Sequence, residues 1–263
     1  MKAPLTKNIT FVVAVNSLKL FESNFSISPC LRGSHNHEIL VQEHFPSAAK
    51  AYNDAIERST NELIVFCHQD LVLPEGWIME LDEALAYLER FDSNWGVLGC
   101  SGMTRDRRHW RYVYSSGLGI SGKPLVRPEP VQTLDEIVLV LRKSSDLRFD
   151  EQLPHFHFYG TDICLKAASL GMTSYVITAF CIHNTHQSLI LPKEFYGCYQ
   201  YIRNAWKKNL PIQTTCVRIT RSNIPIYLRR LRELYLRYIR RKEVGAARVP
   251  DAGILLQEKP SRP

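Results

Sequence analysis

Apolar residues in the first hundred positions fall into short unbroken runs, separated by longer segments of mixed polarity. The runs lie at residues 8–15, 38–41, 61–67 and 95–100, and none of them alternates with polar residues. Runs of this kind are typical of strands that are buried on both faces, as in a parallel sheet. We therefore predict four buried strands in this part of the chain.

Two of the intervening segments have helical periodicity. Residues 47–59 follow Pro46, and Ser47 is in position to cap the first turn. In residues 74–91 the apolar residues recur every three or four positions, which places them on one helix face: these are Ile78, Leu81, Leu85 and Leu88. Alternation of strands and helices predicts an α/β fold with a mostly parallel sheet flanked by helices.

The second half of the chain is less regular. Residues 101–130 are rich in Arg, Gly, Ser and Pro, and we expect a long irregular excursion there. The elements predicted after it are a strand at 131–141, a helix at 162–170 closed by Gly171, a strand at 174–182, a helix at 194–208 and a basic helix at 225–242.

Residues 117–122 formally match the glycine pattern of dinucleotide-binding proteins, GxGxxG. That pattern works only when a helix begins directly after the glycines and presents its N-terminus to the pyrophosphate. Here Pro124, Pro128 and Pro130 follow, and proline is excluded from a helix interior. We interpret the glycines as a turn in an irregular hairpin.

Composition places the chain among ordinary globular proteins. Of its 263 residues 45% are apolar and 22% charged, enough for one large domain with appendages. No apolar run approaches the roughly 18 residues of a membrane-spanning helix. Residues 9–15 lack a following cleavage site, so we expect a strand there and not a signal peptide. Seven cysteines without a CxxC motif argue against a zinc cluster and favour a reducing, cytoplasmic location.

The net charge of +7 is concentrated near the C-terminus. Residues 221–242 hold eight basic residues and a single acid, Glu233. An apolar stripe runs through the same segment: Leu228, Leu231, Tyr235 and Tyr238. Two interpretations remain open, a helix docked on the domain with a solvated basic face, or peripheral contact of residues 222–242 with an anionic membrane. Nucleic acid is an unlikely partner because no other aromatic and basic platform is present.

We divide the chain accordingly. Residues 1–220 form the main domain, with one half at 1–100 and the other at 101–220. Residues 221–243 form the basic amphipathic helix, and residues 244–263 are expected to be a flexible tail.

Polar residues stand at the ends of several predicted strands, where ligands bind in open α/β sheets. They are Asn16, Glu43, the triplet His68-Gln69-Asp70, and His183, and Asp162 begins a helix. Carboxylates and a histidine that converge there would hold a divalent cation and an anionic ligand, and leave one acid as a general base. Structural alternatives exist: Asp70 as a turn residue, Asp162 as a favourable charge at a helix N-terminus, and histidines that only pack.

Several sequence segments in order carry a family resemblance. ITFVVAVN, EILVQE and SAAKAYNDAIERSTNELIVFCHQDLVLPEGWI resemble the nucleotide-binding half of glycosyltransferase-family-2-like enzymes of the GT-A fold. TLDEIVLVLRKS, LRFDEQL, FYGTDICLKAASLG, CIHNTHQS and EFYGCYQYIRNAWKKNLPI resemble the later half. The resemblance thus implies a nucleotide-binding half at 1–100 and an acceptor-side half at 101–220. The resemblance covers about residues 8–215 and is greatest to the branch typified by the streptomycin-biosynthesis StrF domain.

The resemblance implies roles for individual residues. Asp162 would be the general base, Asp70 would face the metal or diphosphate, and His183 would be a metal ligand, with His186 as the alternative. The residues implied at the donor nucleotide are Asn16, Glu43, Lys50, Asn53, His68, Gln69 and Asp70, and those on the acceptor side are Asp135 and Glu136. A divalent cation, Mn²⁺ or Mg²⁺, is implied too, although His68 stands where the family usually has an acid.

The function implied is transfer of a sugar from a nucleotide-sugar donor to a hydroxyl of a carbohydrate or glycosylated acceptor, with inversion. Two alternatives remain: a non-catalytic module that binds nucleotide sugars or glycans, and an adaptor recruited to membranes by its basic helix. A nucleotidyltransferase is disfavoured because no Gly-rich, basic phosphate loop lies near the first strand.

Overall fold

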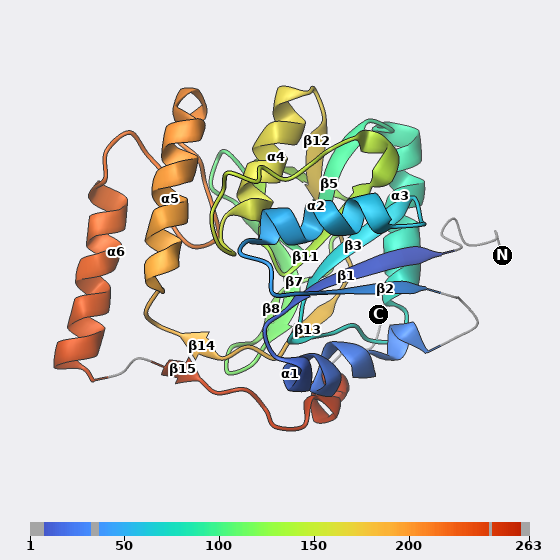
Figure 1. Cartoon of the computed structure of the whole chain (residues 1–263), viewed down its shortest axis with the longest axis horizontal. Coiled ribbons are helices and arrows are strands. Elements are labelled where there is room, and N and C mark those ends of the chain that lie inside the picture. Colours follow the sequence, from blue (N-terminus) through green and yellow to red (C-terminus); the bar gives the residue numbers. More distant parts are fainter. Residues whose placement is uncertain (1–7, 33–36, 242–243, 259–263) are drawn as a thin grey trace.

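The structure is a computed structural model that describes residues 8–32, 37–241 and 244–258. Within these ranges a seven-stranded sheet runs in the order β2-β1-β3-β11-β5-β12-β9 (Figure 1). Its strands are β1 (Ile9–Val15), β2 (Glu38–Glu43), β3 (Leu63–His68), β5 (Trp95–Gly99), β9 (Glu129–Val131), β11 (Val138–Arg142) and β12 (Thr173–Val176). The predicted α/β fold class is confirmed.

Strands from both halves of the chain build this one sheet. β1 pairs in parallel with β2 and β3, whereas β11 runs antiparallel between β3 and β5. Residues 138–141 are all buried, so β11 needs cover on both faces and obtains it only inside the sheet. The predicted division into halves at residue 100 therefore does not separate two structural units.

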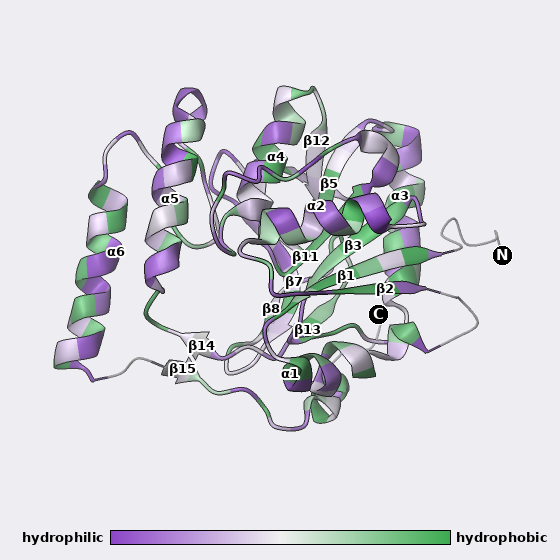
Figure 2. Cartoon of the chain, in the orientation of Figure 1, coloured by the Kyte–Doolittle hydropathy of each residue, from purple (hydrophilic) through white to green (hydrophobic). Residues whose placement is uncertain are grey.

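Helices cover the sheet on both faces. α2 (Ala48–Arg58), α4 (Tyr159–Ser169) and α5 (Lys193–Ala205) contribute to one apolar cluster, and α3 (Trp77–Phe91) to the other. Along β1, Val12 belongs to the first cluster while Phe11 and Val13 belong to the second. Burial on both faces explains why the apolar runs of β1, β3 and β5 do not alternate. The prediction of a buried strand is wrong for β2, which lies at the edge of the sheet with Gln42 as its one buried residue. Figure 2 shows β1 and β3 as strongly hydrophobic.

The stretch expected to be irregular, residues 101–130, contributes three strands to a second sheet. Among the described residues this sheet has six strands: β10 (Thr133–Leu134), β6 (Ser101–Met103), β7 (His109–Ser115), β13 (Cys181–His183), β4 (Leu71–Val72) and, paired with β7, β8 (Gly119–Gly122). Gly117 and Gly119 have positive φ at the turn of the β7–β8 hairpin, so the interpretation of the glycines as a turn is confirmed. The single strand predicted at 174–182 is divided between β12 and β13.

Shorter elements complete the fold. They are α1 (Leu18–Ser23), β14 (Gln187–Ser188), α6 (Ile224–Leu234) with a π-helical continuation at Tyr235–Ile239, β15 (Val244–Ala246), and 3-10 turns at Phe25–Ile27, Pro29–Leu31, Lys143–Ser145, Lys207–Asn209 and Ala252–Glu258. Within the described part of the chain, no helix is long and apolar enough to cross a membrane.

The prediction of a flexible tail is wrong for residues 244–258. β15 pairs with β14, and Ala252 and Leu255 are buried in an apolar cluster with Val72 and Phe180. These apolar side chains anchor the segment because they leave water on packing. Residues 242–243 and 259–263 of the predicted helix and tail lie outside the described residues.

Candidate active site

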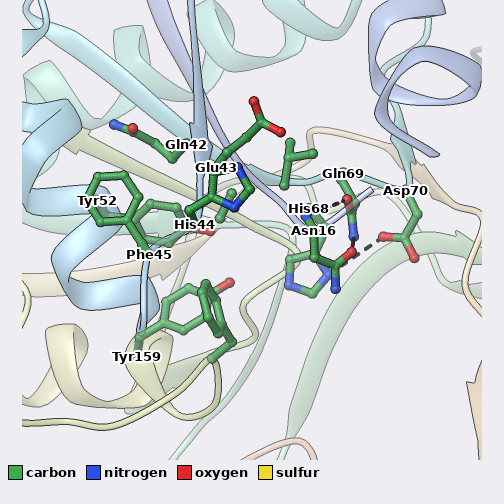
Figure 3. A pocket seen from close by; sticks show the side chains of 13 residues that line it. Asn16, Gln42, Glu43, His44, Phe45, Tyr52, His68, Gln69, Asp70 and Tyr159 are labelled. Carbon is green, nitrogen blue, oxygen red and sulfur yellow. Dashed lines mark hydrogen bonds and ion pairs between the residues drawn. The ribbon is translucent and has the colours of Figure 1, made fainter. Parts of the chain in front are cut away.

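A cavity of about 430 Å³ lies at the carboxyl ends of β1, β2 and β3 (Figure 3). Its volume falls within the range of small-molecule sites, and its position is the one where open α/β sheets bind ligands. Its wall consists of Ala14, Val15, Asn16, Gln42, Glu43, His44, Phe45, Tyr52, His68, Gln69, Asp70, Phe156 and Tyr159. The sequence thus located five of these residues: Asn16, Glu43, His68, Gln69 and Asp70.

Aromatic and polar side chains occupy different parts of the wall. Figure 3 shows Phe45, Tyr52 and Tyr159 grouped on one side, with Asn16 and Gln69 on the other. Gln69 ties the ends of β1 and β3 together, because its Oε1 accepts from the backbone N–H of Asn16 at 3.2 Å and its Nε2 donates to Asn16 Oδ1 at 2.6 Å. The polar rim is therefore held by its own hydrogen bonds.

Asp70 lies among three cationic or imidazole side chains. Its Oδ1 is 3.3 Å from His183 Nε2 and 3.9 Å from His68 Nδ1, while its Oδ2 accepts from Arg248 Nη2 at 2.9 Å. The antiparallel pairing of β4 with β13 sets His183 opposite Leu71, directly beside Asp70. Residues more than a hundred positions apart are thus brought together by a two-residue strand pair.

The charges around Asp70 keep it ionised. Burial alone would raise its pKa, but the hydrogen bond and charge of His183, together with His68 and Arg248, hold the pKa well below its ordinary value. Burial and the neighbouring His183 lower the pKa of His68, although Asp70 opposes this, so its neutral imidazole is favoured. A fixed anion beside a neutral imidazole is a suitable start for binding a cation.

The residues present fit a divalent metal. Ligand atoms of His68, Asp70 and His183 all lie within 4.8 Å of one another. Two imidazole nitrogens and one carboxylate oxygen suit Mn²⁺ or another transition metal better than Mg²⁺, which prefers oxygen ligands. His186, the alternative ligand, is exposed and does not belong to this group.

Arg248 is the functional candidate that sequence reasoning missed. Its Nε donates to the backbone oxygen of Asn184 at 3.1 Å, and Asn184 in turn exchanges two hydrogen bonds with the backbone of Val249, at 2.8 and 2.9 Å. The segment after β15 is therefore fixed beside Asp70. No spacing pattern signals this contact, because Arg248 lies 178 residues from Asp70 in the chain.

Asp135 and Glu136 lie between β10 and β11, outside the wall of the cavity. Burial and the neighbouring Asp135 raise the pKa of Glu136 to about 8, while backbone N–H groups of Gly160 and Phe158 at the start of α4 partly offset this. A Cβ on Gly160 would lie 3.3 Å from Glu136 Cγ, so the glycine lets the two elements approach. Asp135 Oδ2 accepts from Thr215 Oγ1 at 2.6 Å.

Asp162 does not line the cavity, contrary to the role expected of it. It is only 1% exposed, and its Oδ1 accepts from Trp206 Nε1 at 2.7 Å, while its Oδ2 has no hydrogen-bond partner within the described structure. Burial raises the pKa of Asp162 to about 6, against the lowering effect of the Trp206 hydrogen bond. Its carboxylate is directed to the contact between α4 and α5 because the indole is its donor.

Two residues predicted at the donor site, Lys50 and Asn53, lie outside the cavity wall. Lys50 is exposed on α2 and does not line the cavity, although its backbone N–H bonds to the capping hydroxyl of Ser47. Asn53 is buried, and its amide bonds to the backbone N–H and oxygen of Phe149 and to Glu151. All three polar contacts hold α2 to the loop after β11, so this amide serves the fold.

Comparison with known proteins decides the family. A family model described as "Glycosyltransferase like family" matches residues 10–196. The chain belongs to this glycosyltransferase-like family. The family resemblance drawn from the sequence is thereby confirmed. Membership of the streptomycin-biosynthesis branch stays a prediction.

The individual relatives described next have low sequence identity to this chain. A protein of Fuscovulum blasticum described as "ATP synthase subunits region ORF 6" is 29% identical over 167 residues, which cover 61% of this glycosyltransferase-like chain and 66% of that protein. The mannosyltransferase PcManGT from Pyrobaculum calidifontis, solved with GDP-Man and Mn²⁺, is 15% identical with a TM-score of 0.46. The aligned region covers 90% of this chain and 72% of the PcManGT chain. S. aureus TarS is 16% identical with a TM-score of 0.45, over 75% of this chain and 39% of its own.

Proposed function

We propose that the chain transfers a glycosyl group from a nucleotide-sugar donor to a hydroxyl of a carbohydrate or glycosylated acceptor, and that the donor binds in the cavity at the ends of β1–β3. The observation that carries this proposal is the cluster at Asp70, where a buried carboxylate meets two histidines and an arginine beside an aromatic-walled cavity. Family membership supports the same class of reaction.

The two sides of the cavity suit the two parts of a donor. Tyr52, Phe45 and Tyr159 provide apolar ring surfaces for a nucleoside. The diphosphate would lie toward Asp70, where the guanidinium of Arg248 is the positive charge nearest that carboxylate. A leaving nucleoside diphosphate needs its developing negative charge neutralised, and preorganised donors do this at little cost in reorganisation. We assign that role to Arg248.

His68, Asp70 and His183 would hold a divalent cation in the same place. When bound, the cation would supply further positive charge for the diphosphate oxygens. Arg248 already occupies Asp70 Oδ2, so the arginine and a cation would share one carboxylate. This arrangement provides a direct test. Removal of Arg248 should strengthen cation binding at Asp70, and absence of the cation should strengthen the contact between Arg248 and Asp70.

The reaction we propose is an in-line, inverting displacement. The acceptor oxygen forms a bond to the anomeric carbon as the bond from that carbon to the diphosphate oxygen breaks, and the hydroxyl proton passes to a carboxylate. We assign the base role to Glu136, because its backbone oxygen accepts from the hydroxyl of Tyr159 on the cavity wall at 3.2 Å, and because burial raises the pKa of its carboxyl to about 8. Asp162 remains the alternative base, and would need to leave Trp206 to reach an acceptor.

Donor binding is tested with a thermal-shift panel of UDP, GDP, dTDP and CMP sugars, with and without Mn²⁺. A ligand at 100 times its Kd should stabilise the protein by about 2.7 kcal/mol, or roughly 5–10 °C for a domain of this size. We expect a shift with one nucleotide class that is lost in Asp70→Asn and kept in Asp106→Asn, an exposed acid on the β6–β7 loop. No shift with any nucleotide would overturn the donor site.

Donor hydrolysis separates an enzyme from a binding module. We expect slow release of the nucleoside diphosphate in the absence of an acceptor, and loss of that release in Glu136→Gln while the thermal shift remains. Binding without turnover, for every acceptor and cation tried, would favour a non-catalytic module that recognises nucleotide sugars.

A further inference from the structure

α6 and its π-helical continuation lie at the edge of the molecule, with α5 between them and the sheet (Figure 1). Only two residues of this region are buried, Ile226 and Glu233. Glu233 accepts hydrogen bonds from Tyr196 of α5 at 2.5 Å and from Arg229 at 3.0 Å. The side of α6 that meets the domain is therefore marked by a buried carboxylate and its two donors.

The opposite side carries the apolar residues. A row with spacings of four, three, four and three lies along one face of the helix and is 50–67% exposed: Ile224, Leu228, Leu231, Tyr235 and Tyr238. Tyr227, Leu234 and Ile239 are also exposed, at 42–69%. Figure 2 shows hydrophobic and hydrophilic residues interleaved along this helix. A helix docked on a globular domain normally buries its apolar stripe, whereas α6 meets the domain through Ile226 and Glu233 and leaves its apolar stripe exposed.

Arginines flank the apolar stripe. Arg232, Arg240 and Arg241 are exposed along the same segment, whereas Arg230 and Arg237, also exposed, line a hollow between α5 and α6. The basic surface continues at the end of α5, where Lys207 and Lys208 line a hollow of about 410 Å³ together with Arg221. Glu233 is the single acid of residues 221–242, and it is buried and bonded. The exposed surface of α6 is thus apolar with a basic surround.

We propose that α6 is an interfacial anchor that lies in the plane of an anionic lipid surface, with its leucines and tyrosines among the acyl chains and its arginines at the headgroups. A helix with a strongly apolar face and arginine-rich flanks binds in this way, and tyrosine is favoured at the boundary between apolar and polar regions. Attraction to anionic lipids adds to the burial of the stripe.

Charge favours lipid over the other occupants. If two copies of α6 packed face to face, their arginines would be apposed with no exposed acid on the segment to pair with them, and like charges repel. Nucleic acid offers phosphates to the arginines but leaves the leucine row in water. An anionic bilayer satisfies both the apolar row and its basic surround. The proposal does not depend on the donor site.

Vesicle flotation tests the proposal on the whole chain. We expect the protein to float with phosphatidylcholine vesicles that contain phosphatidylglycerol, to float at least tenfold less with phosphatidylcholine alone, and to be released by 0.5 M salt, because surface charge is screened at high ionic strength. These comparisons need no variant. Equal flotation with both vesicle types, or none with either, overturns the proposal.

Variants then assign the contact to α6. Leu228→Ser with Leu231→Ser should lower partitioning about tenfold or more, since two exposed leucines no longer enter the bilayer. Leu118→Ser with Leu170→Ser is the matched control, because these leucines are 62% and 57% exposed on other elements. Unchanged flotation of the α6 variant, or an equal loss in the control, contradicts the assignment.

Light scattering distinguishes a second copy of the chain. A monomer in solution whose mass does not change on Leu228→Ser and Leu231→Ser agrees with the proposal. A dimer that these substitutions convert to a monomer would identify the occupant of the stripe as another copy, and would overturn the lipid assignment.

Discussion

The surroundings of Asp70 and of the start of α4 place carboxylates in opposite electrostatic environments. Asp70 meets His183, His68 and Arg248, which hold its pKa low. Asp162 is buried and Glu136 is half-buried, and burial raises their pKa values to about 6 and about 8. The first environment suits the binding of charge, whereas the second suits the acceptance of a proton near neutral pH. We therefore propose that different carboxylates serve the two tasks, Asp70 at the donor and Glu136 as the base.

The largest effect is expected at Glu136. Glu136→Gln should lower kcat/KM by about 100- to 10,000-fold, the usual contribution of a positioned general base, with little change in donor binding. In the wild-type protein kcat/KM should rise with pH through about 8, because the base works only when deprotonated. An exposed carboxyl of α3, Glu89, provides the control Glu89→Gln. If the rate instead rises through about pH 6 and Asp162→Asn abolishes it, Asp162 is the base.

Glu136→Gln also tests, through the pH dependence of the Tm, whether the surroundings of Glu136 raise its pKa. A carboxyl whose folded pKa is raised contributes stability below its unfolded pKa of about 4.3, and this contribution is lost as pH rises through about 8. The Tm of the wild-type protein should therefore fall relative to Glu136→Gln between pH 5 and 8. Parallel Tm curves over this range would contradict the raised pKa.

Asp70→Asn should have the next largest effect. It removes the charge that Arg248 and the two histidines surround, and we expect activity to fall about 100-fold or more, as when one preorganised electrostatic contact is lost. Mn²⁺ binding, followed by electron paramagnetic resonance, should weaken in parallel. A variant with normal activity and normal Mn²⁺ binding would separate Asp70 from the donor site.

Arg248→Ala tests whether the guanidinium and the metal ion make separate contributions to donor binding at Asp70. Loss of a charge-assisted hydrogen bond to the diphosphate should raise the donor KM about tenfold or more. Since Asp70 Oδ2 is then released, Mn²⁺ should bind more tightly than in the wild type. Arg248→Lys keeps the charge without the planar two-nitrogen geometry, and should recover part of the KM effect. Weaker Mn²⁺ binding in Arg248→Ala would mean that the arginine supports the cation site.

Much of the fold and part of the site followed from local pattern. Buried strands such as β1 and β3 were predictable because their apolar runs need cover on both faces, and polar residues at their ends fell on the cavity wall. Arg248 was not predictable, because it reaches Asp70 through a tertiary contact without local signal. The directions of Asn53 and Asp162 were missed for a related reason: helical position gives a residue's face, but its hydrogen-bond partner comes from another element.

Asn53→Ala tests this distinction, with a moderate effect on stability alone. It leaves the buried backbone N–H and oxygen of Phe149 without their amide partner, which should cost about 1–3 kcal/mol. The donor KM, measured well below the Tm, should not change. A changed KM with an unchanged Tm would restore Asn53 to the nucleoside pocket.

The smallest effect on Mn²⁺ affinity and activity is expected at His186. Comparing His186→Ala with His183→Ala shows which histidine is a ligand of the cation. His186 is exposed and outside the group of ligand atoms, so His186→Ala should leave Mn²⁺ affinity and activity within about twofold of the wild type, as for most surface substitutions. His183→Ala removes an imidazole 3.3 Å from Asp70 and should weaken Mn²⁺ binding about tenfold or more. The two histidines are three residues apart, His183 at the end of β13 and His186 in the loop that follows it, so a general disturbance of this segment would affect both variants alike. Only a specific cation site makes them differ, and equal Mn²⁺ affinities in the two variants would exclude His183 as a ligand.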